Sequence, residues 1–348
     1  MSTLLPKVGL VAGVALLMLC TPLCARAINE DFNDFVYLTA DGIAQAGTLS
    51  TLPESPSAFY FNPAALPRTW IPVLMHNHAP RHFPRRQGDP EMDQLDCDME
   101  SVIIPLPVGT FGYGFSLQDE LGYDYTNHPP GRFDYVLERL SGSETVAAYA
   151  VGSYPVRLGM SYHRLLHTYF PPSPRAVFPG GPNEGIPYAG WLRDGESQRL
   201  GAVLGLPWLR FATVKDALNL RKLDLPAGKQ QVARRKEWRR GWRLLPTGWL
   251  SIAGEKRTVV SLPFSPRVSR SAGRRTESRS SSITLRPLGW LEISLGRWNG
   301  KRTVGVKLAL PGIGLRYAEA KDFLREIVGR AGRVLGDLHF YGVSLGLA

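Results

Sequence analysis

The chain has 348 residues and a formal net charge of +11, with 44% hydrophobic and 20% charged residues. This length accommodates one large domain or two ordinary ones, and the hydrophobic content excludes a chain that is disordered throughout. Glycine and proline are both abundant, at 36 and 28 residues. Because both residues favour turns and disfavour helix interiors, the composition favours a turn-rich, all-β fold over a helical bundle.

Residues 1–27 have the pattern of a secretory signal peptide. Lys7 precedes an uninterrupted apolar run at 8–20, and a small-x-small cleavage site follows at 25–27. The alternative is a transmembrane anchor, but the run is shorter than the roughly 20 apolar residues that a spanning helix needs. We expect an exported protein whose mature chain retains Cys97 alone, which rules out an intramolecular disulfide framework.

Period-two alternation dominates the mature chain. The segments TFGYGFSL at 110–117 and FYGVSLGL at 340–347 alternate bulky apolar residues with small ones. A soluble sandwich buries the bulky face, whereas a membrane barrel turns it toward lipid and keeps the small residues inside. We predict 14 strands, near 70–77, 99–106, 110–117, 145–152, 157–167, 197–204, 209–216, 237–245, 249–260, 281–286, 289–298, 302–309, 313–318 and 337–347.

The connections between these strands alternate between long and short. Trp208, Trp249 and Trp290 each accompany a short, proline-bearing connection, at equal intervals of about 41 residues. The exception is the Asn-Gly pair at 299–300, a strong hairpin signal on the long side. Even strand number and alternating loop lengths are typical of bacterial outer-membrane barrels, whose aromatic residues lie at the lipid headgroups. Both chain ends are then expected on the periplasmic side.

A soluble, secreted β-protein is the alternative to a barrel. The interval between the tryptophans resembles that of a β-propeller blade. A blade needs four strands, however, and each interval holds about two. The membrane barrel therefore explains the pattern better.

A family resemblance comes from particular segments. SAFYFNPAALP at 57–67 joins a β-prone aromatic run to an Asn-Pro-Ala motif at 62–64, directly before the first predicted strand. With the export signal and the segments at 144–165 and 335–347, this layout resembles two kinds of outer-membrane protein. They are the long-chain fatty-acid transporter (FadL) type and the PorV-like type.

The resemblance implies a 14-stranded antiparallel transmembrane β-barrel at 70–348, plugged by an N-terminal hatch at 28–69. In this interpretation Asn62, Pro63 and Ala64 fix the junction between hatch and barrel. Asparagine can cap neighbouring backbone groups, and proline stiffens the corner. The alternative is an ordinary loop corner.

The resemblance also implies a function. A FadL-type barrel in the bacterial outer membrane takes up or binds hydrophobic compounds such as long-chain fatty acids. A PorV-like barrel instead acts as a surface scaffold or export partner. The expected partners are the lipid bilayer and a hydrophobic small molecule, with no cofactor, and no residue is assigned to the ligand.

Two basic runs, at 229–243 and 267–279, fall in predicted long loops. Tryptophan interleaved with arginine in the first run is a pattern that binds nucleic acid, but export argues against that partner. Anionic headgroups, acidic polysaccharide, an anionic ligand and plain solvent remain as interpretations.

Other candidate sites are weaker. His76, His78 and His82 precede an acidic stretch, but a metal site needs a compact donor set, so we expect a solvated loop and no metal. The chain has no Gly-x-Ser-x-Gly elbow, Walker loop or His-Glu-x-x-His motif. His163 and His167 have no partner identifiable by spacing, and we expect no enzyme activity.

Overall fold

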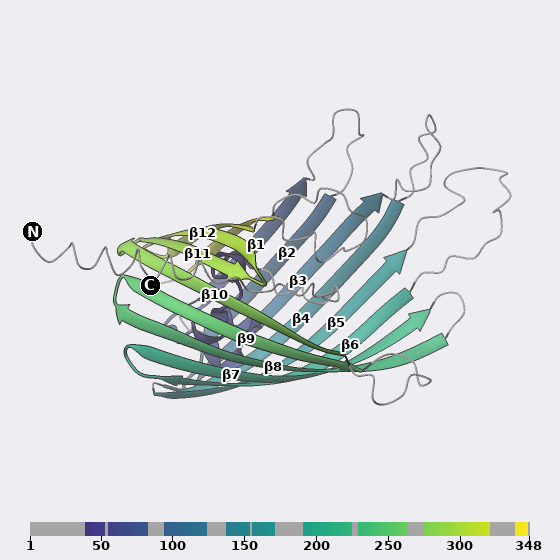
Figure 1. The fold of residues 1–348 in the computed structure, drawn as a ribbon, viewed down its shortest axis with the longest axis horizontal. Helices are drawn as coiled ribbons and strands as arrows, with labels where there is room; N and C mark the ends of the chain where they lie inside the picture. The colour runs from purple at the N-terminus through teal and green to yellow at the C-terminus, as the bar shows by residue number, and fades with distance from the viewer. Residues whose placement is uncertain are drawn as a thin grey trace, which may run out of the picture.

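The computed structural model describes residues 39–52, 55–82, 94–123, 137–153, 155–170, 191–224, 229–262, 274–320 and 338–346. Strands β1 to β14 close into one antiparallel barrel, in which neighbours in sequence pair with each other and β1 pairs with β14 (Figure 1). The predicted 14-stranded barrel is therefore confirmed. Among the described residues, no helix has the length and apolarity needed to cross a bilayer.

The strands are β1 (Val73–His82), β2 (Gln94–Pro105), β3 (Thr110–Tyr123), β4 (Leu137–Ser153), β5 (Val156–Phe170), β6 (Trp191–Gly205), β7 (Leu209–Asp224), β8 (Lys229–Thr247), β9 (Leu250–Leu262), β10 (Arg274–Leu288), β11 (Leu291–Trp298), β12 (Lys301–Leu310), β13 (Ile313–Ala320) and β14 (Leu338–Leu345). Four short helical elements precede them: α2 (Ala40–Ala44), η2 (Leu49–Thr51), η3 (Ala58–Tyr60) and η4 (Pro63–Ala65). Every predicted strand overlaps an observed one, but several observed strands extend further toward the long connections.

Side chains alternate between the two faces of the wall. In β5, Met160 exposes 60% of its surface on the outside, whereas Ser161 exposes 4% on the inside. Leu200 and Phe211 on the neighbouring strands are exposed, while Arg199 is buried. The apolar face is therefore outside and the polar face inside, which is the arrangement of a membrane barrel and the reverse of a soluble β-protein.

The two ends of the barrel differ in their connections. Short turns at 106–109, 206–208, 248–249 and 289–290 lie at the end where β1 begins and β14 finishes, which we call the turn end (Figure 1). The opposite end, with most of the longer connections, is the loop end. Trp208 and Trp290 are about half exposed at the turn end, as predicted for an aromatic girdle.

The Asn-Gly connection between β11 and β12 forms the predicted tight hairpin at the loop end. Asn299 and Gly300 both have positive φ, at 50° and 88°. Two successive residues with positive φ give a two-residue turn whose twist matches that of the antiparallel strands on either side. Glycine adopts a positive φ without steric cost.

The predicted loop position of the basic runs is wrong for 229–236 and for 274–279, whereas the strand predicted at 237–245 lies within an observed strand. The run 229–243 lies within β8, and 274–279 of the second run lies within β10, whereas 267–273 lies outside the described residues. Strand side chains alternate, so the first run divides between the faces. Arg235, Arg239 and Arg243 are buried inside the barrel, while Arg234, Lys236 and Arg240 are exposed on its outer wall. Charges on both faces hide the apolar alternation that identifies a strand.

Candidate functional site

Residues 39–52 and 55–66, which we call the inner segment, lie inside the barrel near its turn end (Figure 1). Its α2 helix contacts β11 to β14, while η4 contacts β4 to β6 on another part of the wall. Ile43, Leu49 and Phe59 in this segment are completely buried. The inner segment therefore packs against wall strands from several sides of the lumen.

The aromatic run forms the 3-10 element η3 instead of the strand that its composition suggests. Phe59, Tyr60 and Phe61 each expose 1% or less of their surface. Inside the barrel, wall strands surround this segment on all sides. Its aromatic side chains are therefore buried without the chain having to form a strand that has one buried and one exposed face.

The Asn-Pro-Ala motif rests against β5 and β6. Asn62 caps η4, because its Oδ1 accepts a hydrogen bond from the Ala64 backbone N–H at 3.0 Å. Its Nδ2 donates to the Ser50 carbonyl at 2.9 Å and so joins two parts of the inner segment. Glycines on the wall permit this close approach: a side chain at Gly159 would collide with the backbone of residues 63–64. The motif thus acts as a local cap and a packing contact.

Arginines of the wall hold the backbone of the inner segment. Arg243 on β8 donates to Gln45 Oε1 at 2.8 Å, to the Thr48 carbonyl at 2.9 Å and to Thr51 Oγ1 at 3.2 Å. Arg199 on β6 donates to the Tyr60 carbonyl at 2.5 Å. These bonds satisfy carbonyl groups that a short helical segment leaves without partners.

An ion pair fixes the start of the inner segment. Asp41 lies 2.8 Å from the Nε of Arg316 on β13 and accepts hydrogen bonds from Ser55 and Ser57. Burial alone raises the pKa of Asp41, but the positive charges of Arg316 and Lys307 and the two hydroxyl donors together hold it below its usual value. Asp41 therefore holds its proton less tightly than an ordinary aspartate.

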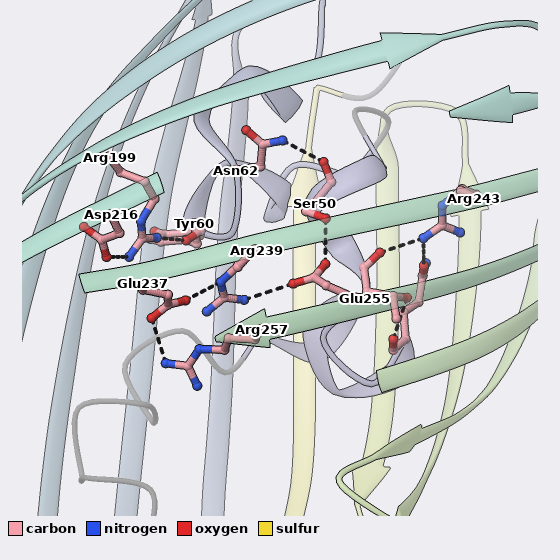
Figure 2. A network of polar contacts seen from close by, with 12 residues as sticks. Ser50, Tyr60, Asn62, Arg199, Asp216, Glu237, Arg239, Arg243, Glu255 and Arg257 are labelled. Atoms are coloured by element: carbon pink, nitrogen blue, oxygen red, sulfur yellow. Dashed lines mark hydrogen bonds and ion pairs between the residues drawn. The ribbon is translucent and has the colours of Figure 1, made fainter. Parts of the chain in front are cut away.

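A cluster of charges lies between the inner segment and the loop end. Glu237 on β8 accepts from Arg235 at 3.0 Å, from Arg239 at 2.5 Å and from Arg257 on β9 at 2.9 Å. We call these four residues the lumen arginine cluster, and Figure 2 shows Glu237, Arg239 and Arg257 of it. Along β8, Arg235, Glu237 and Arg239 precede Gly241, which faces Ser50 of the inner segment. The cluster is therefore on the loop-end side of that contact.

The cluster is connected to the inner segment through one more carboxylate. Arg239 Nη1 lies 3.4 Å from Glu255 Oε1, and Glu255 Oε2 accepts from the Ser50 hydroxyl at 2.6 Å (Figure 2). The Arg239 guanidinium also lies 5.4 Å from the ring centroid of Phe61, within the range of a cation–π contact. A change at Arg239 therefore acts directly on Phe61 and, through Glu255, on Ser50.

A second polar chain links β4 and β5 inside the lumen. His163 Nδ1 lies 2.7 Å from Glu144 Oε1, and its Nε2 lies 2.8 Å from Ser161 Oγ. His163 is fully buried and the other two expose 4% or less. The order carboxylate, imidazole, hydroxyl is that of a serine-hydrolase relay. Sequence spacing did not find this chain, because strand pairing and not sequence distance brings Glu144 to His163.

The histidines of β1 form simple cross-strand pairs on the outer wall. His78 lies 2.7 Å from Asp98, and His76 lies 3.6 Å from Glu100. The described residues contain no group of three or more His, Cys, Asp or Glu side chains that could hold a metal ion. The acidic stretch at 83–93 lies outside the described residues.

Comparison with known proteins gives a fold but no sequence family. No family model and no curated protein matches the chain. The toluene transporter TbuX of Ralstonia pickettii superposes with a TM-score of 0.60 at 12% identity, over 89% of this chain and 98% of that one. The P. putida toluene transporter TodX gives 0.57 at 11% identity, over 88% and 96%. A Pseudomonas aeruginosa FadL homologue gives 0.53 at 12% identity, over 89% and 98%.

The chain has the FadL-type barrel fold. The resemblance inferred from sequence is thus confirmed for the fold, and two of these neighbours are transporters by name. At such low sequence identity, the structural likeness does not assign a functional role to any residue of this chain. The roles of Arg199, Arg243, Arg316 and the lumen arginine cluster are therefore interpreted from their own contacts.

Removing the Asn62 side chain is expected to loosen the inner segment without opening the FadL-type barrel. Asn62→Ala deletes the η4 cap and the bond to Ser50, each worth about 1 kcal/mol. Hydrogen exchange of backbone amides in 48–66 is expected to speed up roughly tenfold, while wall amides keep their protection. Asn219→Ala, at an exposed wall position, is the control. Unchanged exchange in 48–66 contradicts a capping role.

His163→Ala is expected to destabilise the barrel by about 2 kcal/mol, because it removes the hydrogen bond between the imidazole and the buried Glu144 carboxylate. Ser161→Ala removes one hydrogen bond and is expected to cost about 1 kcal/mol. Urea unfolding in detergent, followed by heat-modifiable gel migration, measures both changes. Equal stability of His163→Ala and the parent contradicts this structural role. If the parent hydrolyses an ester and Ser161→Ala abolishes that hydrolysis, the chain has a catalytic role instead.

Proposed function

We propose that the chain is an outer-membrane barrel that takes up hydrophobic compounds, and that long-chain fatty acids are its ligand class. The observation that carries the ligand class is the lumen arginine cluster on the loop-end side of the inner segment. Guanidinium groups bind carboxylates through paired, charge-assisted hydrogen bonds. Toluene, named for two neighbours of this fold, has no carboxylate, so this cluster favours an amphipathic acid over a plain hydrocarbon.

The contacts suggest how such a ligand acts on the inner segment. A fatty-acid carboxylate that reaches Arg239 competes with the Glu237 and Glu255 carboxylates for the same guanidinium. Glu255 also accepts a hydrogen bond from the Ser50 hydroxyl, and the Ser50 carbonyl accepts one from the Asn62 side chain. A shift of Arg239 therefore reaches the Asn-Pro-Ala corner through three contacts. In this proposal the inner segment is the hatch, and Asn62, Pro63 and Ala64 are its seat on the wall.

Uptake into proteoliposomes tests the proposal. We expect labelled oleate to enter vesicles that contain the protein faster than empty vesicles. Oleyl alcohol, which has the same chain without the carboxylate, is expected to enter more slowly than oleate. Equal rates for acid and alcohol contradict the carboxylate site. Absence of both binding and uptake contradicts transport and favours the PorV-like scaffold or export partner.

Localisation is tested separately. We expect the protein to fractionate with outer membranes, to require detergent for extraction and to migrate faster in gels before heating. Mass spectrometry of the mature chain is expected to place its first residue at Ile28, after a cleaved signal peptide. A protein that is soluble without detergent contradicts the membrane placement.

A further inference from the structure

Three cations form a continuous row across the outer wall. Strand register places Arg240 of β8 directly opposite Lys256 of β9, and Lys256 directly opposite Arg279 of β10. All three side chains are exposed on the outward face. Neighbouring strands lie about 4.8 Å apart, so three positive charges fall within about 10 Å.

Such a row is unfavourable by itself. Like charges directly opposite each other destabilise a strand pair. Among the described residues, Glu277 is the one carboxylate that pairs with the row, at 2.9 Å from Lys256, and it also pairs with Arg275 at 2.7 Å. One carboxylate shared between two cations leaves the row strongly positive.

A second pair extends the basic surface along the barrel. Arg297 of β11 lies directly opposite Arg302 of β12, again on the outward face. On β1 and β2, by contrast, the outward His76 and His78 face carboxylates across the strand pair. Cations that face each other across strand pairs therefore occur on β8 to β12, whereas the described cross-strand pairs of β1 and β2 combine histidine with carboxylate.

The row lies at the edge of the apolar wall. On the turn-end side of the row, the next outward residue of β8 is Trp242, which is 41% exposed. Likewise, the next outward residue on the turn-end side of Arg297 is Leu295, and that of Arg302 is Val304. They expose 51% and 39% of their surfaces. A boundary between apolar and basic side chains is where a barrel meets lipid headgroups, and this boundary is on the loop-end side.

We propose that Arg240, Lys256 and Arg279 form a binding site for the phosphate groups of an anionic glycolipid in the outer leaflet. The proposal rests on the outer-membrane placement proposed above, with the loop end outward, but not on transport. Exposed guanidinium and ammonium groups at headgroup depth match phosphates in charge and position. Bound phosphates also relieve the repulsion within the row.

Binding of lipid A, a bisphosphorylated glycolipid, to the full chain in detergent tests the site. Each cation near an anionic headgroup contributes about fivefold in affinity, so Arg240→Gln/Lys256→Gln/Arg279→Gln is expected to weaken binding on the order of 100-fold. The control is Arg68→Gln/Arg164→Gln/Arg221→Gln, which removes three exposed cations elsewhere and is expected to bind like the parent. Chemically dephosphorylated lipid A is expected to bind weakly to all three proteins.

Three outcomes overturn the proposal. They are equal affinity of the row variant and the parent, equal affinity for dephosphorylated lipid A, and full displacement of lipid A by equimolar inorganic phosphate. The last outcome assigns the row to a free anion instead of a lipid. This assay measures no transport, so the two proposals can fail separately. Lipid A binding without oleate uptake supports the lipid site and contradicts the proposed function. Oleate uptake without lipid A binding contradicts the lipid site and supports the proposed function.

Discussion

Replacing Gly159 with valine is expected to displace the inner segment and convert a closed barrel into a conducting one. Gly159 faces the lumen at the point where Pro63 and Ala64 cross β5, and even a Cβ there collides with their backbone. Backbone atoms cannot move aside as a flexible side chain can. The corner must therefore leave its seat, and with it goes the contact of Asn62 Nδ2 with the Ala202 carbonyl on β6.

The expected result is a rise in single-channel conductance of about tenfold or more in planar bilayers, since an unplugged barrel leaves a water-filled lumen. Gly289→Val is the matched control, because nothing lies within 4 Å of a Cβ at that turn. Heat-modifiable migration of both variants verifies that the barrel has folded. A folded Gly159→Val barrel with parental conductance shows that the inner segment does not close the lumen at this corner.

The barrel itself was predictable because its signals are local. Period-two alternation located every strand, and turn residues such as Asn299 and Gly300 gave their connections. The prediction failed where charge replaced apolar alternation, as in 229–236, where a strand with cations on both faces resembles a polar loop.

The candidate site was much less predictable, because its contacts join distant positions. Arg243 bonds Gln45, which lies far away in the chain, and Glu144 reaches His163 only through the register of β4 and β5. No spacing rule encodes such pairs. The Asn-Pro-Ala motif was recognisable because capping is a local interaction of Asn62 with Ala64, whereas its seat at Gly159 depends on the closed barrel.

The second large effect is expected from Arg239→Gln, which tests the ligand class directly. The substitution removes the guanidinium between Glu237 and Glu255 while keeping a polar side chain of similar reach. A charge-assisted hydrogen bond is worth about 1.5–3 kcal/mol, so oleate binding is expected to weaken roughly 10- to 100-fold. Oleyl alcohol has no carboxylate for Arg239 to bind, so its affinity is expected to stay within about twofold of the parent.

Two controls make the outcome specific. Lys236→Gln removes a cation from the same strand but from its outward face, so its oleate affinity is expected to match the parent. Arg239→Lys keeps the charge but loses the planar fork, and an intermediate affinity is expected. If Arg239→Gln weakens acid and alcohol equally, the loss reflects a distorted lumen and the carboxylate site is contradicted. If only the acid is affected, the arginines inside the wall select the cargo.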